Sequence, residues 1–288
     1  SACGPQAGKG YPAMGHTAIV PYRHALQVLS TPARRVRYYR KQRNASQTQR
    51  PHQIAADHFM PHRQLSAMIL AAGRGERLRP LTDTVPKPLL QVGAHRLIDY
   101  HLYALAHGGI TQVVINVSHL ADEIITALGN GSRYGVSIRY SKEPVGALET
   151  GGGIRQALSL IESDPFIVIN SDIWTNLQIE DLPGQVEHLA HLVLVDNPAH
   201  HSRGDFFLCG NRVSTVAEHA ARRLTFAGVG VYRHALFNDT TPGRFALAPL
   251  LATAMAQGKV SGQHFAGCWL DVGDPARLSE ARARVGIT

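Results

Sequence analysis

Short apolar runs alternate with amphipathic segments between residues 67 and 170. The apolar runs have the length of buried strands and cover residues 67–71, 113–117, 136–140 and 166–170. The segments between them have helical spacing and cover residues 97–107, 120–128 and 154–161. Strands that alternate with helices in this way predict an α/β fold, with a Rossmann-like, mostly parallel sheet and helices on both faces.

The second half of the chain is less regular. Its strand candidates are residues 191–196, 228–232 and 260–265, and its helix candidates are residues 247–257 and 275–285. Polar or glycine residues follow three strands of the first half, at Gly73, at residues 116–119 and at residues 170–172. Ligands of open α/β sheets bind beyond the carboxyl ends of the strands. We therefore expect the functional site at that edge of the sheet.

Charge divides the chain into two parts. Residues 1–66 contain ten Lys or Arg and one acid, a net charge of +9, whereas residues 67–288 contain 19 basic and 20 acidic residues. We interpret residues 1–66 as a basic, mostly disordered extension and residues 67–288 as the functional domain. A transit peptide, or an arm that contacts RNA or anionic lipid, stays open as an alternative. The near-neutral domain argues against nucleic-acid binding.

Cysteine usage and hydropathy indicate a cytoplasmic protein without a membrane partner. Cys3, Cys209 and Cys268 are widely scattered, which favours neither a disulfide framework nor a zinc site. No apolar run approaches the roughly 18 to 20 residues of a membrane span. The first residues also lack the apolar core and cleavage site of a signal peptide.

The first glycine-rich stretch, Gly73-Arg-Gly75-Glu-Arg77, directly follows the strand at residues 67–71. Its two glycines allow a sharp turn that brings backbone N–H groups close to a ligand. Arg77 and the downstream Lys87 add cations that suit phosphate oxygens. The spacing is not a dinucleotide fingerprint, because residue 78 is Leu78, and no Gly-Lys-Ser or Gly-Lys-Thr makes it a P-loop. The stretch predicts a phosphate-binding loop of another kind.

A second glycine-rich stretch and two aspartates complete the candidate site. We interpret Glu149-Thr-Gly-Gly-Gly153 as a loop at a helix start, whose glycines leave room for a planar base or a sugar ring. Asp172 and Asp271 could share one Mg²⁺, because this ion takes carboxylate and phosphate oxygens. A flexible cap for the glycines and turn roles for the aspartates are the structural alternatives. His200-His201 has no third ligand nearby, which argues against a metal site there.

Residues 67–90 as a whole resemble the signature of the sugar-1-phosphate nucleotidyltransferases, a glycine-rich loop with an arginine and a downstream Pro-Lys. Asn170-Ser-Asp172 and Trp269-Leu-Asp-Val-Gly273 are similar to the metal-binding segments of that family. Residues 148–153, 197–206, 223–232 and 260–262 resemble one branch, the bacterial N-acetylmuramate-1-phosphate uridylyltransferases. The resemblance covers residues 67–288 and none of residues 1–66.

The resemblance implies a nucleotidyltransferase fold of the glycosyltransferase-A type and catalytic roles for Arg77 and Lys87. It implies a Mg²⁺ cofactor held by Asp172 and Asp271. The implied nucleotide-binding residues are Ala71, Ala72, Gly73, Gly75, Arg77, Lys87, Asn116 and Ser118. The implied residues for the sugar phosphate are Glu149, Gly151, Gly152, Asn170, Asp205, Arg222 and Arg223.

One segment departs from the family pattern. Many members carry Glu-Lys-Pro shortly before a Gly-x-Gly-x-Tyr strand, and its lysine grips the sugar phosphate. This chain has Glu218-His-Ala-Ala-Arg222-Arg223 at that place. We expect Arg222 or Arg223 to substitute through bidentate geometry, with plain surface charge as the alternative.

The implied reaction joins a nucleoside triphosphate to a sugar 1-phosphate, with UTP and N-acetyl-α-muramate 1-phosphate favoured, as in peptidoglycan recycling. A phosphate monoester is already mostly dianionic at pH 7, so the attack on the α-phosphorus needs no general base. Catalysis then depends on positioning and charge neutralisation. The alternatives are a mannose-1-phosphate guanylyltransferase, a glucose-1-phosphate thymidylyl- or uridylyltransferase, a catalytically silent nucleotide-sugar sensor, and a nucleic-acid-binding module. The oligomeric state stays open.

Overall fold

The computed structural model describes residues 65–144, 148–217 and 219–286. Their main sheet has nine strands in the order β5-β4-β1-β6-β11-β8-β12-β10-β9. These strands are β1 (Ser66–Leu70), β4 (Gln112–Val117), β5 (Ser137–Lys142), β6 (Phe166–Asn170), β8 (Ala190–Val195), β9 (Phe206–Cys209), β10 (Arg212–Ser214), β11 (Arg222–Tyr232) and β12 (Val260–His264). Two small ladders pair β2 (Gln91–Val92) with β3 (His95–Arg96), and β7 (Ile173–Thr175) with β13 (Trp269–Asp271). The predicted extension lies outside the described residues, except that Leu65 is described and Ser66 begins β1.

The helices agree with the predicted segments, with one large shift at a helix start. They are α2 (Leu97–His107), α3 (Ala121–Leu128), α4 (Glu149–Ala157), α5 (Leu247–Ala256) and α6 (Pro275–Gly286). Short 3₁₀ turns include η1 (Glu76–Leu78), η2 (Leu81–Asp83), η3 (Lys87–Leu89), η4 (Ser132–Tyr134), η5 (Leu158–Leu160), η6 (Ile179–Asp181), η7 (Ala199–His201) and η8 (His234–Phe237). Helix α4 begins at Glu149 instead of Ile154, so the second glycine-rich stretch is helical and not a loop. None of the helices that the structure describes is long and apolar enough to cross a membrane.

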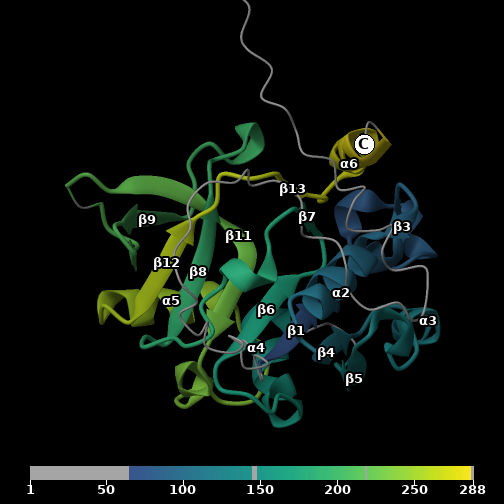
Figure 1. The fold of residues 1–288 in the computed structure, drawn as a ribbon, viewed down its shortest axis with the longest axis horizontal. Helices are drawn as coiled ribbons and strands as arrows, with labels where there is room; N and C mark the ends of the chain where they lie inside the picture. Colours follow the sequence, from purple (N-terminus) through teal and green to yellow (C-terminus); the bar gives the residue numbers. More distant parts are fainter. Residues whose placement is uncertain (1–64, 145–147, 218, 287–288) are drawn as a thin grey trace, which may run out of the picture. The chain divides into compact units, whose positions relative to one another are not determined.

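All strands of the main sheet run in one direction except β10 and β11. The expected parallel arrangement is therefore confirmed for β5, β4, β1 and β6, which lie side by side in Figure 1. Strand β11 lies antiparallel between β6 and β8. Strand β9 is joined to β10 by a two-residue turn, a connection that makes antiparallel neighbours of two strands. Strand β11 pairs with β9 on its other edge, so β10 and β11 run in the same direction on either side of β9.

The core consists of two apolar layers, one on each face of the sheet. Successive residues of β1 alternate between them: Ala67 and Ile69 pack in the layer with α2 and α3, and Met68 packs in the layer with α4 and α5. This alternation confirms the predicted helices on both faces. Because both faces of β1 are covered, its residues 67–70 are continuously apolar.

The C-terminal helix α6 returns to the segment that follows Lys87. Arg282 Nε donates to the carbonyl of Gln91 at 2.9 Å. A Cβ on Gly93 would lie 2.4 Å from Val285 Cγ1, so the glycine allows α6 to approach the β2–β3 hairpin closely. Figure 1 shows α6 beside β3. The end of the domain is thus attached to a segment near its beginning.

Candidate active site

Three cavities meet at Asn170, the last residue of β6. The glycine-loop cavity holds about 230 Å³ and is lined by residues that include Gly73, Gly75, Lys87, Asn116, Glu149 and Asp172. The apolar cavity holds about 270 Å³ and is lined by residues that include Asp205, Phe206, Phe226, Tyr232 and Leu247. The carboxylate cavity holds about 360 Å³ and is lined by residues that include Arg77, Asp172, His200, Asp271 and Arg277. Asn170 lines all three, so ligands in different cavities would be neighbours.

The ends of three parallel strands place the site. Leu70 of β1 is in register with Asn116 of β4 on one side and with Asn170 of β6 on the other. Parallel strands bring their carboxyl ends to the same edge of a sheet, which is where ligands of such sheets bind. The strand ends that precede Gly73, residues 116–119 and residues 170–172 were predicted to lie at one edge of the sheet, and this arrangement is confirmed.

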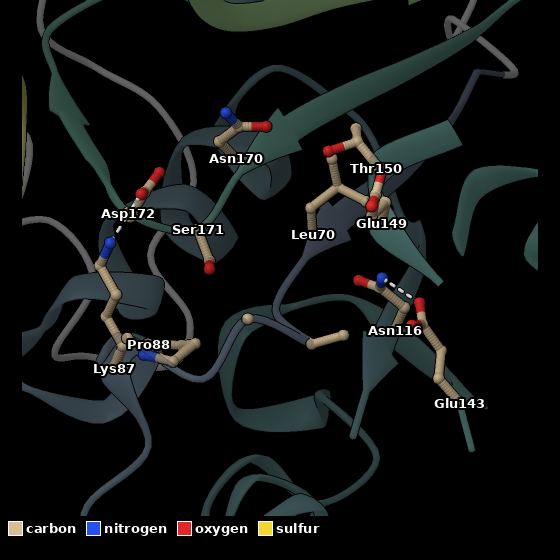
Figure 2. A pocket seen from close by; sticks show the side chains of 13 residues that line it. Leu70, Lys87, Pro88, Asn116, Glu143, Glu149, Thr150, Asn170, Ser171 and Asp172 are labelled. Carbon is tan, nitrogen blue, oxygen red and sulfur yellow. Dashed lines mark hydrogen bonds and ion pairs between the residues drawn. The ribbon is translucent and has the colours of Figure 1, made fainter. Parts of the chain in front are cut away.

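The Gly73–Gly75 loop is open at one glycine and packed at the other. Among the described residues, a Cβ on Gly73 would meet no atom within 4 Å, so this backbone is open on that side. Gly75 has a φ of +67° and its Cβ position lies 3.1 Å from Lys87 Cβ, so it needs to be a glycine for both reasons. Lys87 Nζ lies 2.7 Å from Asp172 Oδ2 (Figure 2). Lys87, which packs against Gly75, and Asp172 thus lie together at one wall of the cavity.

The opposite wall is a buried hydrogen-bond chain (Figure 2). Asn116 Oδ1 accepts from the backbone N–H of Ala71 at 2.8 Å, and Asn116 Nδ2 donates to Glu143 Oε1 at 2.6 Å. Glu143 Oε2 accepts from the backbone N–H of Leu148 at 2.9 Å. Ser118 donates to a backbone carbonyl at 3.1 Å and does not line the glycine-loop cavity. These hydrogen bonds connect the ends of β1, β4 and β5 and involve Ala71, Asn116 and Ser118. The predicted contacts of these three residues with a nucleotide stay predictions.

The interpretation of residues 149–153 as a glycine loop with room for a ligand ring is wrong. A Cβ on Gly151 would lie 2.5 Å from the ring of Phe245, and one on Gly152 would lie 2.2 Å from the carbonyl oxygen of Gly243. The N–H of Gly152 donates to the carbonyl of Phe245 at 3.0 Å. The glycines let another segment of the chain lie against α4. This packing does not support the predicted contacts of Gly151 and Gly152 with a sugar.

Glu149 and Thr150, at the start of α4, do line the glycine-loop cavity. Glu149 has a φ of +59°, which is unfavourable for a residue with a side chain and is found most often at functional positions. Its Oε1 lies 2.9 Å from Arg244 Nε. The predicted position of Glu149 beside a ligand is compatible with this geometry.

A small ladder brings the two predicted metal ligands together. In the β7–β13 pair, Asp271 is in register with Ile173, the residue after Asp172. The N–H of Val272 also donates to the carbonyl of Asp172 at 2.7 Å. Two aspartates about a hundred residues apart in the chain thus line the same carboxylate cavity.

Basic side chains surround Asp271. Arg277 Nη1 donates to Asp271 Oδ2 and lies 2.7 Å from His200 Nε2. Because a guanidinium can only donate, His200 Nε2 accepts this bond and its proton lies on Nδ1. Nε2 lies 3.0 Å from Asp271 Oδ1 but cannot then donate to it. Asp271 Oδ1 is accordingly buried without a hydrogen-bond partner among the described residues.

His101 lies beneath this site on α2. The side chain is fully buried, and burial lowers the pKa of its imidazole to about 4. A hydrogen bond with the backbone of Ile173 favours the charged form but is the smaller effect. His101 is therefore neutral at pH 7. Its Nε2 has no partner among the described residues.

Arg222 and Arg223 do not line the three cavities, and their predicted role in place of the missing lysine stays a prediction. Arg222 Nη2 lies 2.8 Å from Asp196 Oδ1, and the Arg223 guanidinium lies 5.3 Å from the centre of the Phe207 ring. Both residues stand at the start of β11, where it pairs with β9. Asp205 does line the apolar cavity, and its Oδ2 accepts from a backbone N–H at 2.8 Å.

Several lining residues were not predicted from the sequence. They are Leu70, Pro88, Glu143, Thr150, Ser171, Arg277 and the apolar side chains Phe206, Phe226, Tyr232, Leu247 and Leu251. Glu143 follows β5, so the rule that sites lie at strand ends could have found it. Arg277 belongs to a helix at the far end of the chain, and no motif in the sequence indicates it.

No group of three or more His, Cys, Asp or Glu within residues 65–144, 148–217 and 219–286 is arranged to hold a metal ion by itself. Two aspartates still fit Mg²⁺, because this ion usually takes one or two carboxylates and completes its shell with phosphate oxygens and water. Asp271 Oδ1, buried without a hydrogen bond, is the observation that favours such a ligand.

A largely parallel α/β sheet whose strand ends carry a glycine loop, a lysine and paired aspartates is typical of enzymes that transfer nucleotidyl or phosphoryl groups. Residues 66–202 match the model of the nucleotidyl transferase family. A relative from Neisseria meningitidis serogroup B, described as N-acetylmuramate alpha-1-phosphate uridylyltransferase, is 49% identical and aligns over 77% of this chain and 99% of its own length. The chain belongs to the nucleotidyl transferase family.

Two further comparisons agree with this assignment. A Caulobacter vibrioides protein with the same description is 36% identical over 76% of this chain and 96% of its own length. The crystal structure of HddC from Yersinia pseudotuberculosis superposes with a TM-score of 0.64, covering 76% of this chain and 99% of that one, at 22% identity. The structural match shows that the fold is shared.

Proposed function

We propose that this enzyme transfers the uridylyl group of UTP to N-acetylmuramate 1-phosphate, releasing pyrophosphate and UDP-N-acetylmuramate. The observation that carries the proposal is the contact between Lys87 and Asp172, where the glycine-loop cavity and the carboxylate cavity meet. A junction of this kind suits two substrates that must meet. The choice of base and sugar is supported by the descriptions of the Neisseria and Caulobacter relatives.

The nucleoside triphosphate fits the glycine-loop cavity, because the open backbone at Gly73 can approach its phosphates closely. Lys87 is half-buried at the same wall and would neutralise charge that develops at the α-phosphate. Arg77 is exposed and makes no hydrogen bond or ion pair within the part of the chain that the structure describes. It would take the β- and γ-phosphates.

Mg²⁺ would be held by Asp172 and Asp271, and when bound it neutralises phosphate charge and orients the two substrates. Lys87 donates to one oxygen of Asp172, and Arg277 donates to one oxygen of Asp271. The attacking group is the phosphate of the sugar substrate, which needs no proton acceptor because it is already ionised. This chain's residues then contribute position and charge, and no general base is required.

The sugar fits the apolar cavity. Phe206, Phe226 and Tyr232 offer surface to the sugar ring and its methyl groups, and Asp205 is the only charged side chain that the described residues contribute to the lining. Because none of these lining residues is a cation, the phosphate of the sugar would point toward the carboxylate cavity, which meets the apolar cavity at Asn170 and Gly228. A cytoplasmic location is proposed together with these substrates.

Pyrophosphate release by the full-length chain in the presence of Mg²⁺ tests the proposal. Each of the four common nucleoside triphosphates is paired with N-acetylmuramate, mannose, glucose and N-acetylglucosamine 1-phosphates. We expect release with UTP and N-acetylmuramate 1-phosphate. Release only with mannose or glucose 1-phosphate would keep the chemistry and overturn the substrate. Folded protein that releases no pyrophosphate with any pair would overturn the proposed activity and favour a nucleotide-sugar sensor.

A further inference from the structure

Two guanidinium groups converge in the carboxylate cavity, although they come from opposite ends of the domain. A Cβ built on Gly273 would lie 2.5 Å from Arg277 Nη2 and 2.8 Å from Arg77 Nη2. Both nitrogens are thus next to the same point, and both residues line the carboxylate cavity. Gly273 is buried, and its missing side chain provides the space in which the two groups meet.

The two groups differ in their partners. Arg277 is buried on α6, and its side chain is fixed by Asp274, whose Oδ2 lies 2.8 Å from both Nε and Nη2. Its Nη1 is used by Asp271 and His200. A guanidinium has five N–H donors, so one donor of Arg277 is left, on the nitrogen that faces Arg77. Arg77 has no hydrogen bond or ion pair with any residue in the described ranges.

An anion that lies between two guanidinium groups is attracted by both of them. We infer that Arg277 is a phosphate-binding residue that acts together with Arg77 as a pair of guanidinium forks. Two forks from different elements can hold several oxygens of one tetrahedral group, as planar guanidinium does with phosphate. The carboxylate cavity, bounded by Asp172 and Asp271, is where phosphate oxygens of the proposed reaction would lie.

The ligand is a phosphate group, and it has two possible sources: the pyrophosphate portion of the nucleotide or the phosphate of the sugar. The inference rests on the proposed function for the presence of these groups in the cavity. It goes beyond that function because it assigns to Arg277 the phosphate-binding role of the missing lysine. Arg222 and Arg223 do not line the cavities in which that role would be carried out. It also explains why residue 273 is glycine, since any side chain would separate the forks.

Calorimetric titration of the full-length protein with inorganic pyrophosphate, and separately with N-acetylmuramate 1-phosphate, tests the inference. Metal is removed with EDTA, so that an effect on Asp271 as a metal ligand cannot contribute. The variants are Arg277→Lys, which keeps the charge but loses the fork, and Gly273→Ala, which keeps both arginines but pushes them apart. Arg284→Gln is the matched control, because Arg284 lies on the same helix and pairs with the exposed Glu280.

We expect both variants to weaken the binding of one anion about tenfold or more, because that is the effect of losing one charge-assisted hydrogen bond. The control variant should bind both anions as the wild type does. Loss confined to pyrophosphate identifies the nucleotide's phosphates as the ligand, and loss confined to the sugar phosphate identifies the other source. Unchanged binding of both anions in folded Arg277→Lys and Gly273→Ala would overturn the inference. So would a wild-type protein that binds neither anion without metal.

The test is independent of the substrate assignment. Pyrophosphate is released whichever base and sugar the enzyme uses, so a wrong choice of sugar leaves the pyrophosphate titration interpretable. If turnover with UTP and N-acetylmuramate 1-phosphate is found but Arg277→Lys binds both anions normally, the proposed function stands and the role of Arg277 falls. Thermal melting shows whether each variant is folded. If Arg277→Lys is not, the binding measurements on Gly273→Ala decide the test.

Discussion

The two glycine-rich segments of this protein look alike in the sequence and do opposite things in the structure. Gly73 faces open space at the end of β1, so that loop can receive a ligand. Gly151 and Gly152 lie inside α4, and the space that their side chains would fill is occupied by residues 243–245. Glycine indicates that something approaches the backbone closely. The sequence does not say whether a ligand or another part of the chain does so.

The largest effect we expect is at Lys87, which depends on the open loop for its position. Lys87→Ala removes the cation at the junction of the cavities, and we expect turnover to fall by about a hundredfold to a thousandfold with the fold intact. Pyrophosphate release and circular dichroism measure the two quantities. Lys142→Ala, an exposed lysine paired with Asp122, is the control. Wild-type turnover in Lys87→Ala would remove Lys87 from the mechanism.

His101 is buried beneath the site, and the pH dependence of stability tests whether it is buried in its neutral form. Its pKa is about 4 when folded against an ordinary value of 6.5, so the unfolded chain binds a proton that the folded protein does not. The free energy of unfolding should fall as pH drops below 6.5 and level off near pH 4, by about 3 kcal/mol from this group. Urea unfolding of His101→Gln should show that much less pH dependence than the wild type. His107→Gln, exposed on the same helix, serves as control, and equal slopes for His101→Gln and wild type would contradict the assignment.

Gly152→Ala tests the packed glycines directly. Alanine in a helix normally stabilises a protein by about 1 kcal/mol relative to glycine. Here the new Cβ would lie 2.2 Å from the Gly243 carbonyl oxygen, so we expect a net loss of about 1 to 3 kcal/mol from overpacking. Urea or thermal unfolding gives the sign. A more stable Gly152→Ala protein would show that residues 243–245 do not lie against α4.

Gly73→Ala is the counterpart in the open loop. Its Cβ meets no protein atom, so the free energy of unfolding should stay within about 0.5 kcal/mol of the wild type. The methyl group would project into the space proposed for the nucleotide, and we expect the KM for nucleotide to rise about tenfold. Unfolding and steady-state kinetics on one preparation separate the two effects. Destabilisation without a change in KM would reverse the comparison between the two segments.

The smallest effect should come from Arg222→Ala. Arg222 pairs with Asp196 on the surface, and exposed ion pairs contribute about 0 to 1 kcal/mol. We expect the KM for sugar 1-phosphate to change less than about twofold, since the residue lines none of the three cavities. A rise of tenfold or more would restore the role that the sequence suggested for Arg222 in place of the missing lysine.

Local patterns in the sequence were sufficient for much of the fold. The apolar runs and helical spacing predicted β1, β4, β6, α2 and α5 to within one residue at each end, because burial and periodicity depend on neighbouring residues only. The direction of β11 could not be predicted, because it depends on pairing with β6 and β8, which are distant in the sequence. Strands β7 and β13 are three residues each and have no period to detect.

What the sequence determined by itself was the edge of the sheet that carries the site. Gly73 and Asp172 were placed by their position just after buried strands, and Lys87 by the Pro-Lys step downstream of the glycine-rich stretch. Only the tertiary structure decided that Asp271 meets Asp172, that the glycines of α4 serve packing, and that Arg277 faces Arg77 across Gly273. The physical reason is the distance along the sequence between the residues that interact. Strand and helix patterns arise from residues a few positions apart, whereas these contacts join segments about a hundred or two hundred residues apart, which come together only when the sheet and α6 have packed.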